Sequence, residues 1–245
     1  MKTEDEGFEK NFDLTILPVK KTEGGIKILK EVSPILPDIK TGSCCAVVSS
    51  PHNGKSNLIM NLLCRNAFFR DSFQDVYIFS STSKTDQTCK RLHEFPNFCV
   101  YDHFDDRVLQ KILDAQSATP EEERGPIAII LDDMVGIKQN SLFHKISCSY
   151  RHYSVSLLLY SVQRLKQLPT IVRSNLGYAW IGKVSPTELS RVSEEFAEDF
   201  GGEENFERHY RTTQNEKYNF LYCDRDRQPP KLYKNFGPCL YSADN

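Results

Sequence analysis

The residues of this chain best suited to chemistry form a short polar stretch at 49–56 that ends in the tripeptide Gly-Lys-Ser. An apolar run at 44–48 precedes it, and a helix-like stretch follows from Asn57. Backbone N–H groups in a loop between a strand and a helix can point at a bound phosphate. Lys55 could then reach the β- and γ-oxygens of a nucleoside triphosphate, and the hydroxyl of Ser56 could ligate Mg²⁺. The residues predicted to contact the nucleotide are Ser50, Pro51, His52, Asn53, Gly54, Lys55, Ser56 and Asn57.

This stretch departs from the usual phosphate-loop pattern at one position. The pattern is G-x-x-x-x-G-K-[ST], and Ser49 stands where the first glycine would be. Since that glycine relieves a turn, either Ser49 adopts the turn or the loop takes another path. The alternative is a Gly-Lys-Ser tripeptide that only begins an ordinary helix.

Two carboxylates follow a second apolar run. Residues 127–131 predict a buried strand of the kind found in parallel sheets covered on both faces, and Asp132 and Asp133 end it. Ligands bind at the carboxyl ends of such strands, where Mg²⁺ and an attacking water would be held. A strand followed by an Asp-rich turn is the simpler explanation. The order of the two motifs along the chain favours a working triphosphate site.

A third group of polar residues follows the predicted strand at 156–161. Gln163 comes just after it and could touch both the γ-phosphate and the attacking water, as a sensor. Arg164 and Arg173 follow, and an arginine there could reach the phosphate of a neighbouring subunit. Equally, Gln163 could cap a helix and Arg173 could lie in solvent.

Alternating strands and helices predict an α/β fold with a mostly parallel central sheet flanked by helices, and with short additions at both ends. We expect strands at 44–49, 75–79, 98–101, 127–133, 156–161, 178–183 and 219–223. We expect helices at 54–69, up to about 94, and at 105–116, 141–150 and 187–200. Residues 13–40 are expected to form extended segments, as strands that lead into the core, and 229–238 an extended tail. The predicted organisation is a flexible 1–12, a single domain at 13–236 with its core at about 42–225, and a tail at 237–245.

Composition bounds the remaining possibilities. A chain of 245 residues can bury a substantial core as one domain. We find no apolar stretch of ~18 residues, so no membrane span is expected, and the charged N-terminus lacks the apolar core of a secretory signal. The eight cysteines are scattered without a C-x-x-C pair, which predicts reduced, buried thiols in an intracellular protein. With a net charge of −2, contact with DNA would need a local basic patch or a ring of subunits.

Four motifs in this order resemble the FtsK–HerA superfamily. They are Ser-Pro-x-x-Gly-Lys-Ser at 50–56, the apolar strand with Asp132 and Asp133, Ser-x-Gln at 161–163, and Pro-x-x-Val-Arg-Ser-Asn at 169–175. Within the superfamily they look most like the genome-packaging ATPases of poxviruses, giant viruses and virophages. The resemblance covers about residues 26–236.

The resemblance implies a RecA-like P-loop core of the ASCE type that works as a homo-oligomeric ring. ATP hydrolysis between subunits would drive double-stranded DNA into a preformed capsid, in contact with a capsid vertex protein. It implies that Asp132 is the Mg²⁺ partner acting through water, and that Asp133 is the carboxylate that polarises the attacking water. Many members have Glu at the latter position; Asp is one methylene shorter, so the water must sit closer. Gln163 matches the sensor, and Arg173 or Arg164 the arginine that acts in trans.

A packaging ATPase would be found in the host cytoplasm or a viral factory, or with the virion. Lys84, in the loop at 80–85, and the segment near Lys138 are candidates for the DNA channel. Three alternatives stay open. Asp133 begins a D-x-x-G sequence like that of a GTPase, although no Asn-Lys-x-Asp signature appears. A small-molecule kinase would need an acceptor pocket and a lid, and a nucleotide-binding scaffold subunit would bind without hydrolysis.

Overall fold

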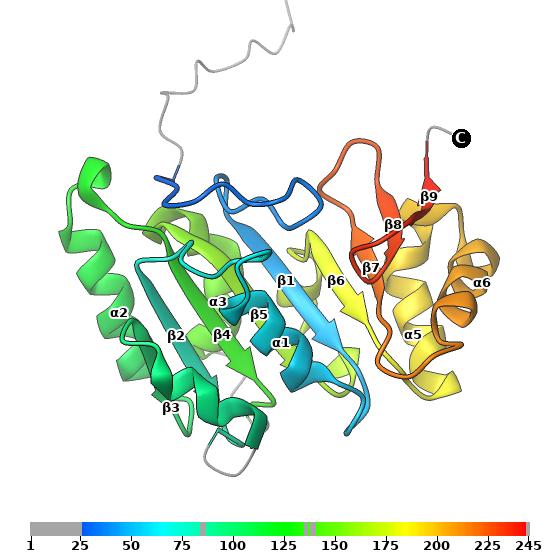
Figure 1. Ribbon diagram of the computed structural model, residues 1–245, viewed down its shortest axis with the longest axis horizontal. Helices are drawn as coiled ribbons and strands as arrows, with labels where there is room; N and C mark the ends of the chain where they lie inside the picture. Colours follow the sequence, from blue (N-terminus) through cyan, green and yellow to red (C-terminus); the bar gives the residue numbers. More distant parts are fainter. Residues whose placement is uncertain (1–25, 84–86, 135–136, 138–140, 244–245) are drawn as a thin grey trace, which may run out of the picture.

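The computed structural model describes residues 26–83, 87–134, 137 and 141–243. The predicted flexible segment at 1–12 and the channel candidates Lys84 and Lys138 lie outside the described residues, as do Val135 and Gly136 of the D-x-x-G sequence. The described chain forms one central sheet with helices on both faces (Figure 1).

The sheet has nine strands and is parallel over most of its width. In spatial order the strands are β3 (Phe98–Tyr101), β2 (Asp75–Ser80), β4 (Ile127–Asp132), β5 (Val155–Val162), β1 (Ser43–Val48), β6 (Tyr178–Ile181), β7 (Leu221–Asp224), β8 (Lys231–Lys234) and β9 (Cys239–Ser242). The pairs from β3 to β6 are parallel, and those from β6 to β9 are antiparallel. The mostly parallel sheet predicted from the sequence is therefore confirmed.

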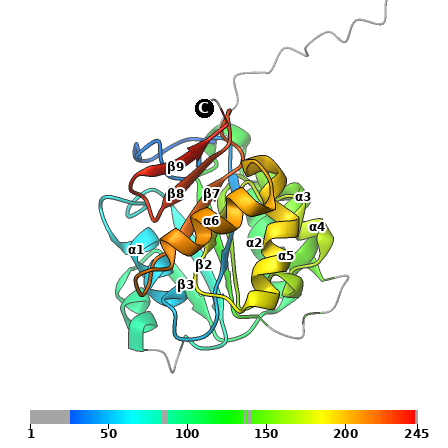
Figure 2. The same cartoon turned by 90° about the vertical axis from the view of Figure 1, so that its right-hand side faces the viewer.

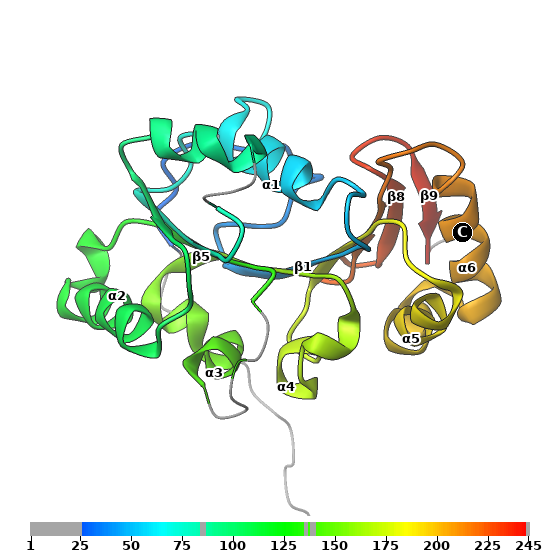
Figure 3. The same ribbon diagram turned by 90° about the horizontal axis from the view of Figure 1, so that it is seen from below.

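Every residue of β1, β4 and β5 is buried, because helices cover the sheet on both sides. One face carries α1 (Lys55–Cys64) and the 3₁₀ helix η1 (Gln87–Glu94) (Figure 3). The other face carries α2 (Asp106–Ala118), α3 (Leu142–Ser149), α4 (Thr170–Arg173), α5 (Pro186–Phe196) and α6 (Glu203–Thr213).

Alternate residues of each strand enter two separate cores. On β5, Leu157 and Leu159 pack on the α1 side, whereas Leu158 and Tyr160 pack on the opposite side. This arrangement fixes the register of the sheet, because a slip by one residue would exchange the two sets. In that register Ser80, Asp132 and Ser161 lie side by side at the carboxyl edge of the sheet.

The N-terminal part of the predicted domain differs from the expectation of strands. The described residues 26–40 form turns and bends, and they cover the α1-side core with the buried side chains of Leu36 and Ile39. The ammonium group of Lys30 donates to the carbonyl oxygens of Asn66 at 2.6 Å, Arg70 at 2.9 Å and Phe68 at 3.2 Å. Lys30 thereby joins this segment to the turns that follow α1.

Four helices differ from the prediction. The helix expected at 54–69 ends at Cys64, because Arg65 has an extended backbone. The helix expected at 187–200 divides into α5, with Ser185 as its N-cap, and the 3₁₀ turn η5 (Ala197–Phe200). Helix α6 and the single turn of α4 were not predicted at all.

The predicted extended tail at 229–238 contains β8 and leads to β9 at the sheet edge. Cross-strand aromatic contacts hold this part of the sheet together. Trp180 stacks on Tyr222 with ring centroids 5.0 Å apart, and Tyr222 stacks on Tyr233 at 5.7 Å. The three rings lie in neighbouring positions of β6, β7 and β8.

The prediction that all the cysteines are buried is wrong for part of the set. Cys44, Cys45 and Cys223 are buried, Cys64 is half-buried, and Cys99, Cys148 and Cys239 are exposed. All seven of these thiols are free. No helix in the described part of the chain combines the length and the apolar character that crossing a bilayer requires.

Candidate functional site

The loop between β1 and α1 leaves the carboxyl end of β1, at the lower edge of the sheet in Figure 1. Two of its residues have a left-handed backbone, His52 with φ 61° and Gly54 with φ 91°. Gly54 is the N-cap of α1 and provides no side-chain cap. The first N–H groups of α1 are therefore without a side-chain partner at the cap, as a phosphate-binding helix end requires.

Ser49 shows how the loop manages without the first glycine of the motif. It is fully buried and is not among the residues with positive φ, so this position needs no glycine backbone. Its N–H donates to the carbonyl oxygen of Val162 at 3.1 Å, and its hydroxyl to that of Lys183 at 3.4 Å. A Cβ added to Gly182 would lie only 2.5 Å from Oγ of Ser49. The space for the serine side chain thus comes from a glycine on the neighbouring strand end.

Lys55 links the two predicted motifs. Its ammonium group donates to the carbonyl oxygen of Ser49 at 3.1 Å and lies 3.6 Å from Oδ2 of Asp133. The side chain of the lysine is 7% exposed and that of the aspartate 20% exposed. The ammonium group is therefore shielded from solvent, whereas part of the carboxylate can be reached by it. Asp133 leaves β4 with φ 47°, and its N–H donates to the carbonyl oxygen of Ser161 at 2.9 Å.

Asp132 is buried one residue earlier, at the end of β4. The hydroxyl of Ser80 donates to its Oδ2 at 2.8 Å. Burial raises the pKa of Asp132, and the charge of Asp133 acts in the same direction, whereas Ser161, Ser80 and Lys55 act against it. A buried carboxylate of this kind is suited to binding a cation, because the positive charge would lower the pKa that burial raises.

Ser56 and Asp132 line the same small hollow between α1 and the sheet. Among the described residues, no group of three or more His, Cys, Asp or Glu side chains could hold a metal ion. One hydroxyl and one carboxylate nevertheless fit Mg²⁺, which keeps several waters and takes its other ligands from phosphate oxygens. The donor set is therefore consistent with Mg²⁺ bound together with a nucleotide.

Gln163 is the first residue beyond β5, the strand between β1 and β4, so it comes to the same edge as the acidic pair. The suggested capping role belongs to another residue. The side chain of Gln167 accepts from the N–H groups of Gln163 at 3.0 Å and Arg164 at 2.8 Å, and so closes the short helix η4 (Leu165–Gln167). The half-buried side chain of Gln163 is not the cap of η4.

The two candidate arginines have different surroundings. Arg164 is exposed. Arg173 forms an ion pair with Glu195 of α5, and it also donates to the carbonyl oxygen of Leu168 and the hydroxyl of Thr170, both at 3.2 Å. Arg173 is therefore engaged by α4 and α5 of its own chain, and is not free in solvent as the alternative prediction had it.

The structure thus brings Lys55, Ser56, Asp132 and Asp133 to one place and holds Arg173 elsewhere within the chain. Sequence reasoning missed Ser80, Gly182 and Glu195. For Ser80 a signal existed, because it ends a strand at the same sheet edge. Gly182 and Glu195 owe their importance to tertiary contacts, for which the sequence holds no local signal.

A parallel sheet with the phosphate loop after β1, an acidic pair after β4 and one strand between them defines the class of P-loop ATPase folds with an inserted strand. The predicted α/β fold class is confirmed. No protein-family model and no curated protein matches the sequence.

Solved structures of the same class share this fold. The genome packaging NTPase B204 from Sulfolobus turreted icosahedral virus 2, in complex with ATP-gammaS, is 17% identical with a TM-score of 0.53, over 80% of this chain and 99% of that chain. EssC (ATPases 2 and 3) from Geobacillus thermodenitrificans is 12% identical with a TM-score of 0.54, over 80% of this chain and 39% of that one. Thermomonospora curvata EccC (ATPases 2 and 3) is 13% identical with a TM-score of 0.51, over 76% and 37% of the two chains. At these identities the likeness is one of fold, and it agrees with the resemblance found in the motifs.

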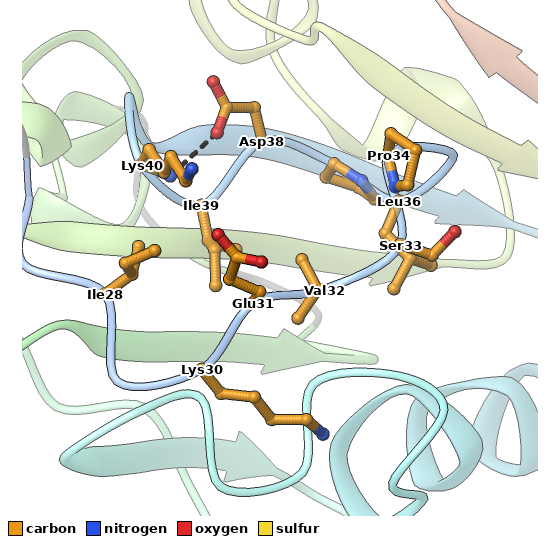
Figure 4. Close-up of a pocket in the computed structure, with 11 residues that line it drawn as sticks. Ile28, Lys30, Glu31, Val32, Ser33, Pro34, Leu36, Asp38, Ile39 and Lys40 are labelled. Carbon is orange, nitrogen blue, oxygen red and sulfur yellow. Dashed lines mark hydrogen bonds between the residues drawn. The ribbon is translucent and has the colours of Figure 1, made fainter.

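A second hollow, of about 350 Å³, is formed by the segment before β1 (Figure 4). This segment lies at the upper edge of the sheet in Figure 1, opposite the edge at which β1 ends and the phosphate loop begins. It is lined by residues between Ile28 and Lys40, and within it the N–H of Lys40 donates to Oδ1 of Asp38 at 2.9 Å. Its lining includes none of the predicted site residues, so it is separate from the candidate nucleotide site.

Proposed function

We propose that this protein is an ATP-hydrolysing DNA translocase that packages double-stranded viral DNA into a preformed capsid. The observation that carries the proposal is the 3.6 Å approach of Lys55 to Asp133, which unites a phosphate loop and an acidic strand end in one site. The genome packaging NTPase B204 has the same fold and was solved with ATP-gammaS, AMP and AMPPCP. That likeness supports ATP as the nucleotide.

In the proposed site each residue has a separate task. Lys55 contacts the β- and γ-phosphates, while Ser56 and, through water, Asp132 hold Mg²⁺, which neutralises charge on the phosphates. Asp133 polarises the attacking water, and Gln163 contacts that water and the γ-phosphate. The short side chain of Asp133 is compatible with this task because its carboxylate already lies 3.6 Å from the ammonium group of Lys55, the residue proposed to hold the γ-phosphate that the water attacks.

We infer a ring of identical chains because an arginine of the neighbouring subunit would complete each nucleotide site. Head-to-tail contacts between identical chains close into rings, and they place each site at a subunit boundary. Arg173 or Arg164 of one subunit then stabilises the phosphate charge in the next, which makes hydrolysis depend on assembly. The proposed partners are double-stranded DNA, further copies of this chain and a capsid vertex protein. The proposed place of action is the host cytoplasm or a viral factory, with retention in the virion as a further outcome.

A nucleotide-binding scaffold subunit with little hydrolysis is the second candidate. The ion pair of Arg173 with Glu195 favours it, because the guanidinium proposed to act in trans already has a carboxylate partner within its own chain. A small-molecule kinase would require an acceptor pocket beside the γ-phosphate, for which the described residues provide no independent support.

The decisive experiment measures ATP turnover per subunit against protein concentration, with and without double-stranded DNA, for the wild type and Lys55→Ala. We expect turnover that rises with concentration and with DNA, and that Lys55→Ala abolishes. Turnover unaffected by both variables would favour a kinase. Tight ATP binding without turnover under any of these conditions would favour the scaffold subunit.

A further inference from the structure

A hollow of about 230 Å³ opens beside the phosphate loop. Its walls come from the loop residues His52 and Asn53, from Lys183 beyond β6, and from residues 214–219 between α6 and β7. Figures 1 and 2 show the chain between α6 and β7 running to the same edge of the sheet at which β1 ends. The hollow therefore adjoins the candidate site, although none of the four central residues of that site lines it.

The hollow and the acidic pair lie on opposite sides of β1. Strand β5 separates β1 from β4, which carries the acids, whereas β6 and then β7 follow on the other side. Just after the loop, at the first position of α1, Lys55 is directed toward Asp133. A triphosphate whose γ end faces this pair runs through the loop and directs its nucleoside toward β6 and β7. That is the side on which Lys183 and residues 214–219 form the hollow.

Tyr218 carries the largest ring in the wall of this hollow, which also includes the imidazole of His52, and the conformation of Tyr218 is unusual. The residue is 61% exposed, and its backbone has φ 66°. A left-handed backbone is costly for a bulky residue, and an exposed ring gains little from burial in return. The ring lies against the loop, because a Cβ added to Gly54 would be 3.2 Å from Cδ1 of Tyr218.

Hydrogen bonds around Asn219 hold the segment that carries Tyr218. The side chain of Asn219 donates to Glu216 at 3.0 Å and accepts from Asn235 at 2.9 Å, and its carbonyl oxygen accepts from Gln214 at 3.1 Å. These contacts join the loop to Gln214, the C-cap residue of α6, and to Asn235 just after β8. The position of Tyr218 is thus set before a ligand arrives, which lowers the entropy cost of binding.

We propose that this hollow binds the base and ribose of the nucleotide, with the ring of Tyr218 as the surface on which the base stacks. The inference rests on the proposed function, because it assumes a triphosphate in the loop between β1 and α1. An aromatic ring gives stacking energy to any base, so Tyr218 contributes affinity for a nucleoside and not for phosphate alone. Tyr218 is thereby a binding residue and takes no part in the chemical step.

The test compares two ligands that share the phosphates and differ in the nucleoside: ATP and inorganic tripolyphosphate, each with Mg²⁺. Dissociation constants are measured by calorimetry for the wild type, Tyr218→Ala, Tyr218→Phe and Lys55→Ala. We expect Tyr218→Ala to weaken ATP about tenfold, as the loss of one stacking contact does, and to leave tripolyphosphate unchanged. Tyr218→Phe keeps the ring and should bind ATP as the wild type does.

Equal weakening of both ligands by Tyr218→Ala, or no weakening of ATP, would overturn the inference. The Lys55→Ala protein separates this failure from a failure of the proposed function. If Lys55→Ala weakens both ligands while Tyr218→Ala weakens neither, the loop binds phosphate and only the stacking role is wrong. If Lys55→Ala changes neither, the phosphate site itself is refuted, and the inference falls with it.

Discussion

Arg173 and Glu195 form an ion pair that joins α4 to α5, with side chains 28% and 19% exposed. The residues are 22 positions apart in the sequence. In this pair Glu195 binds the guanidinium of Arg173, the group proposed to act on a neighbouring subunit. An arginine that acts in trans must therefore exchange Glu195 for a phosphate, and this exchange is a step at which assembly could control hydrolysis.

Arg173→Ala should retain nucleotide affinity and lose turnover by roughly 10³-fold, the lower range for a trans-acting arginine. Glu195→Gln removes the competing charge and keeps Arg173, so its turnover should equal or exceed that of the wild type. Stability should change little in Glu195→Gln, whose amide oxygen still accepts from Arg173. It should fall by about 1–3 kcal/mol in Arg173→Ala, because this change leaves the mostly buried Glu195 without its partner. ATP turnover and melting temperature check these outcomes. Wild-type turnover in Arg173→Ala would transfer the role to Arg164 or remove it.

Subunit mixing tests the same residue in another way. Arg173→Ala subunits keep an intact Lys55, and Lys55→Ala subunits keep an intact Arg173. In a mixed ring, some boundaries combine the two intact residues, so mixing two inactive proteins should restore part of the turnover. Mixing either protein with itself provides the baseline.

Asp133→Asn should bind ATP and fail to hydrolyse it. The asparagine has nearly the same shape and tolerates the φ of 47° found at this position, but it cannot polarise water as a carboxylate does. Loss of turnover by ~10²-fold or more, with unchanged ATP affinity, is the expected result. Asp71→Asn is a matched control, since Asp71 also has a positive φ, 62°, and is exposed away from the site. Unchanged hydrolysis in Asp133→Asn would exclude it as the base.

Asp132→Asn should stabilise the protein in the absence of metal. A buried carboxylate whose pKa is raised in the folded chain costs stability wherever it is ionised, and the amide removes that charge while its oxygen still accepts from Ser80. Each kcal/mol relieved raises the melting temperature by about 2–4 °C for a chain of this size. The further stabilisation that Mg²⁺ and ATP give the wild type should be lost in the variant. A lower melting temperature without metal would contradict this account.

The approach of the two motifs was easier to predict from the sequence than the helices and strands of the C-terminal part. Phosphate loops and acidic strand ends are local patterns, so Lys55 and Asp133 could be assigned to one site before their 3.6 Å approach was known. Helix α6 was missed because it is strongly polar, with Phe206, Tyr210 and Thr213 as its only buried residues. The spacing of Phe206 and Tyr210 is helical and was the available signal.

The strands at the C-terminal edge were missed for a different reason. Strand β8 has four residues, of which only Leu232 and Tyr233 are buried, and its pairing with β7 is decided by contacts with Tyr222. A short strand of this kind has no stable form without its neighbours, so its sequence alone carries little information. The ion pair of Arg173 with Glu195 likewise depends on how α4 and α5 meet.

The N-cap of α2 gives a pH-dependent prediction away from the site. The side chain of Arg107 bonds Asp105, the N–H of Arg107 donates to Oδ1 at 2.8 Å, and together they lower the pKa of Asp105 to about 2. A carboxylate with a lowered pKa stabilises the fold above its ordinary pKa, and this contribution disappears as the pH falls through about 2. Asp105→Asn keeps a capping oxygen and loses the charge, so it should melt below the wild type at neutral pH. The difference should shrink as the pH falls below 3.8, the ordinary pKa of the group. A constant difference down to the lowest accessible pH would refute the role of the charge.

Gly182→Ala should damage the phosphate loop through Ser49. The added Cβ would lie 2.5 Å from Oγ of Ser49 and 2.8 Å from the ring of Phe220, and overpacking of this kind costs about 1–3 kcal/mol. The expected results are a lower melting temperature and weaker ATP binding, because Ser49 also accepts the bond from Lys55. Ser49→Gly creates the usual first glycine of the motif and removes the closest clash. The double variant Ser49→Gly with Gly182→Ala should therefore recover part of both losses, the remainder being due to Phe220. If the two substitutions instead add without rescue, the serine does not occupy the space left by Gly182, and another cause must explain why this loop dispenses with its first glycine.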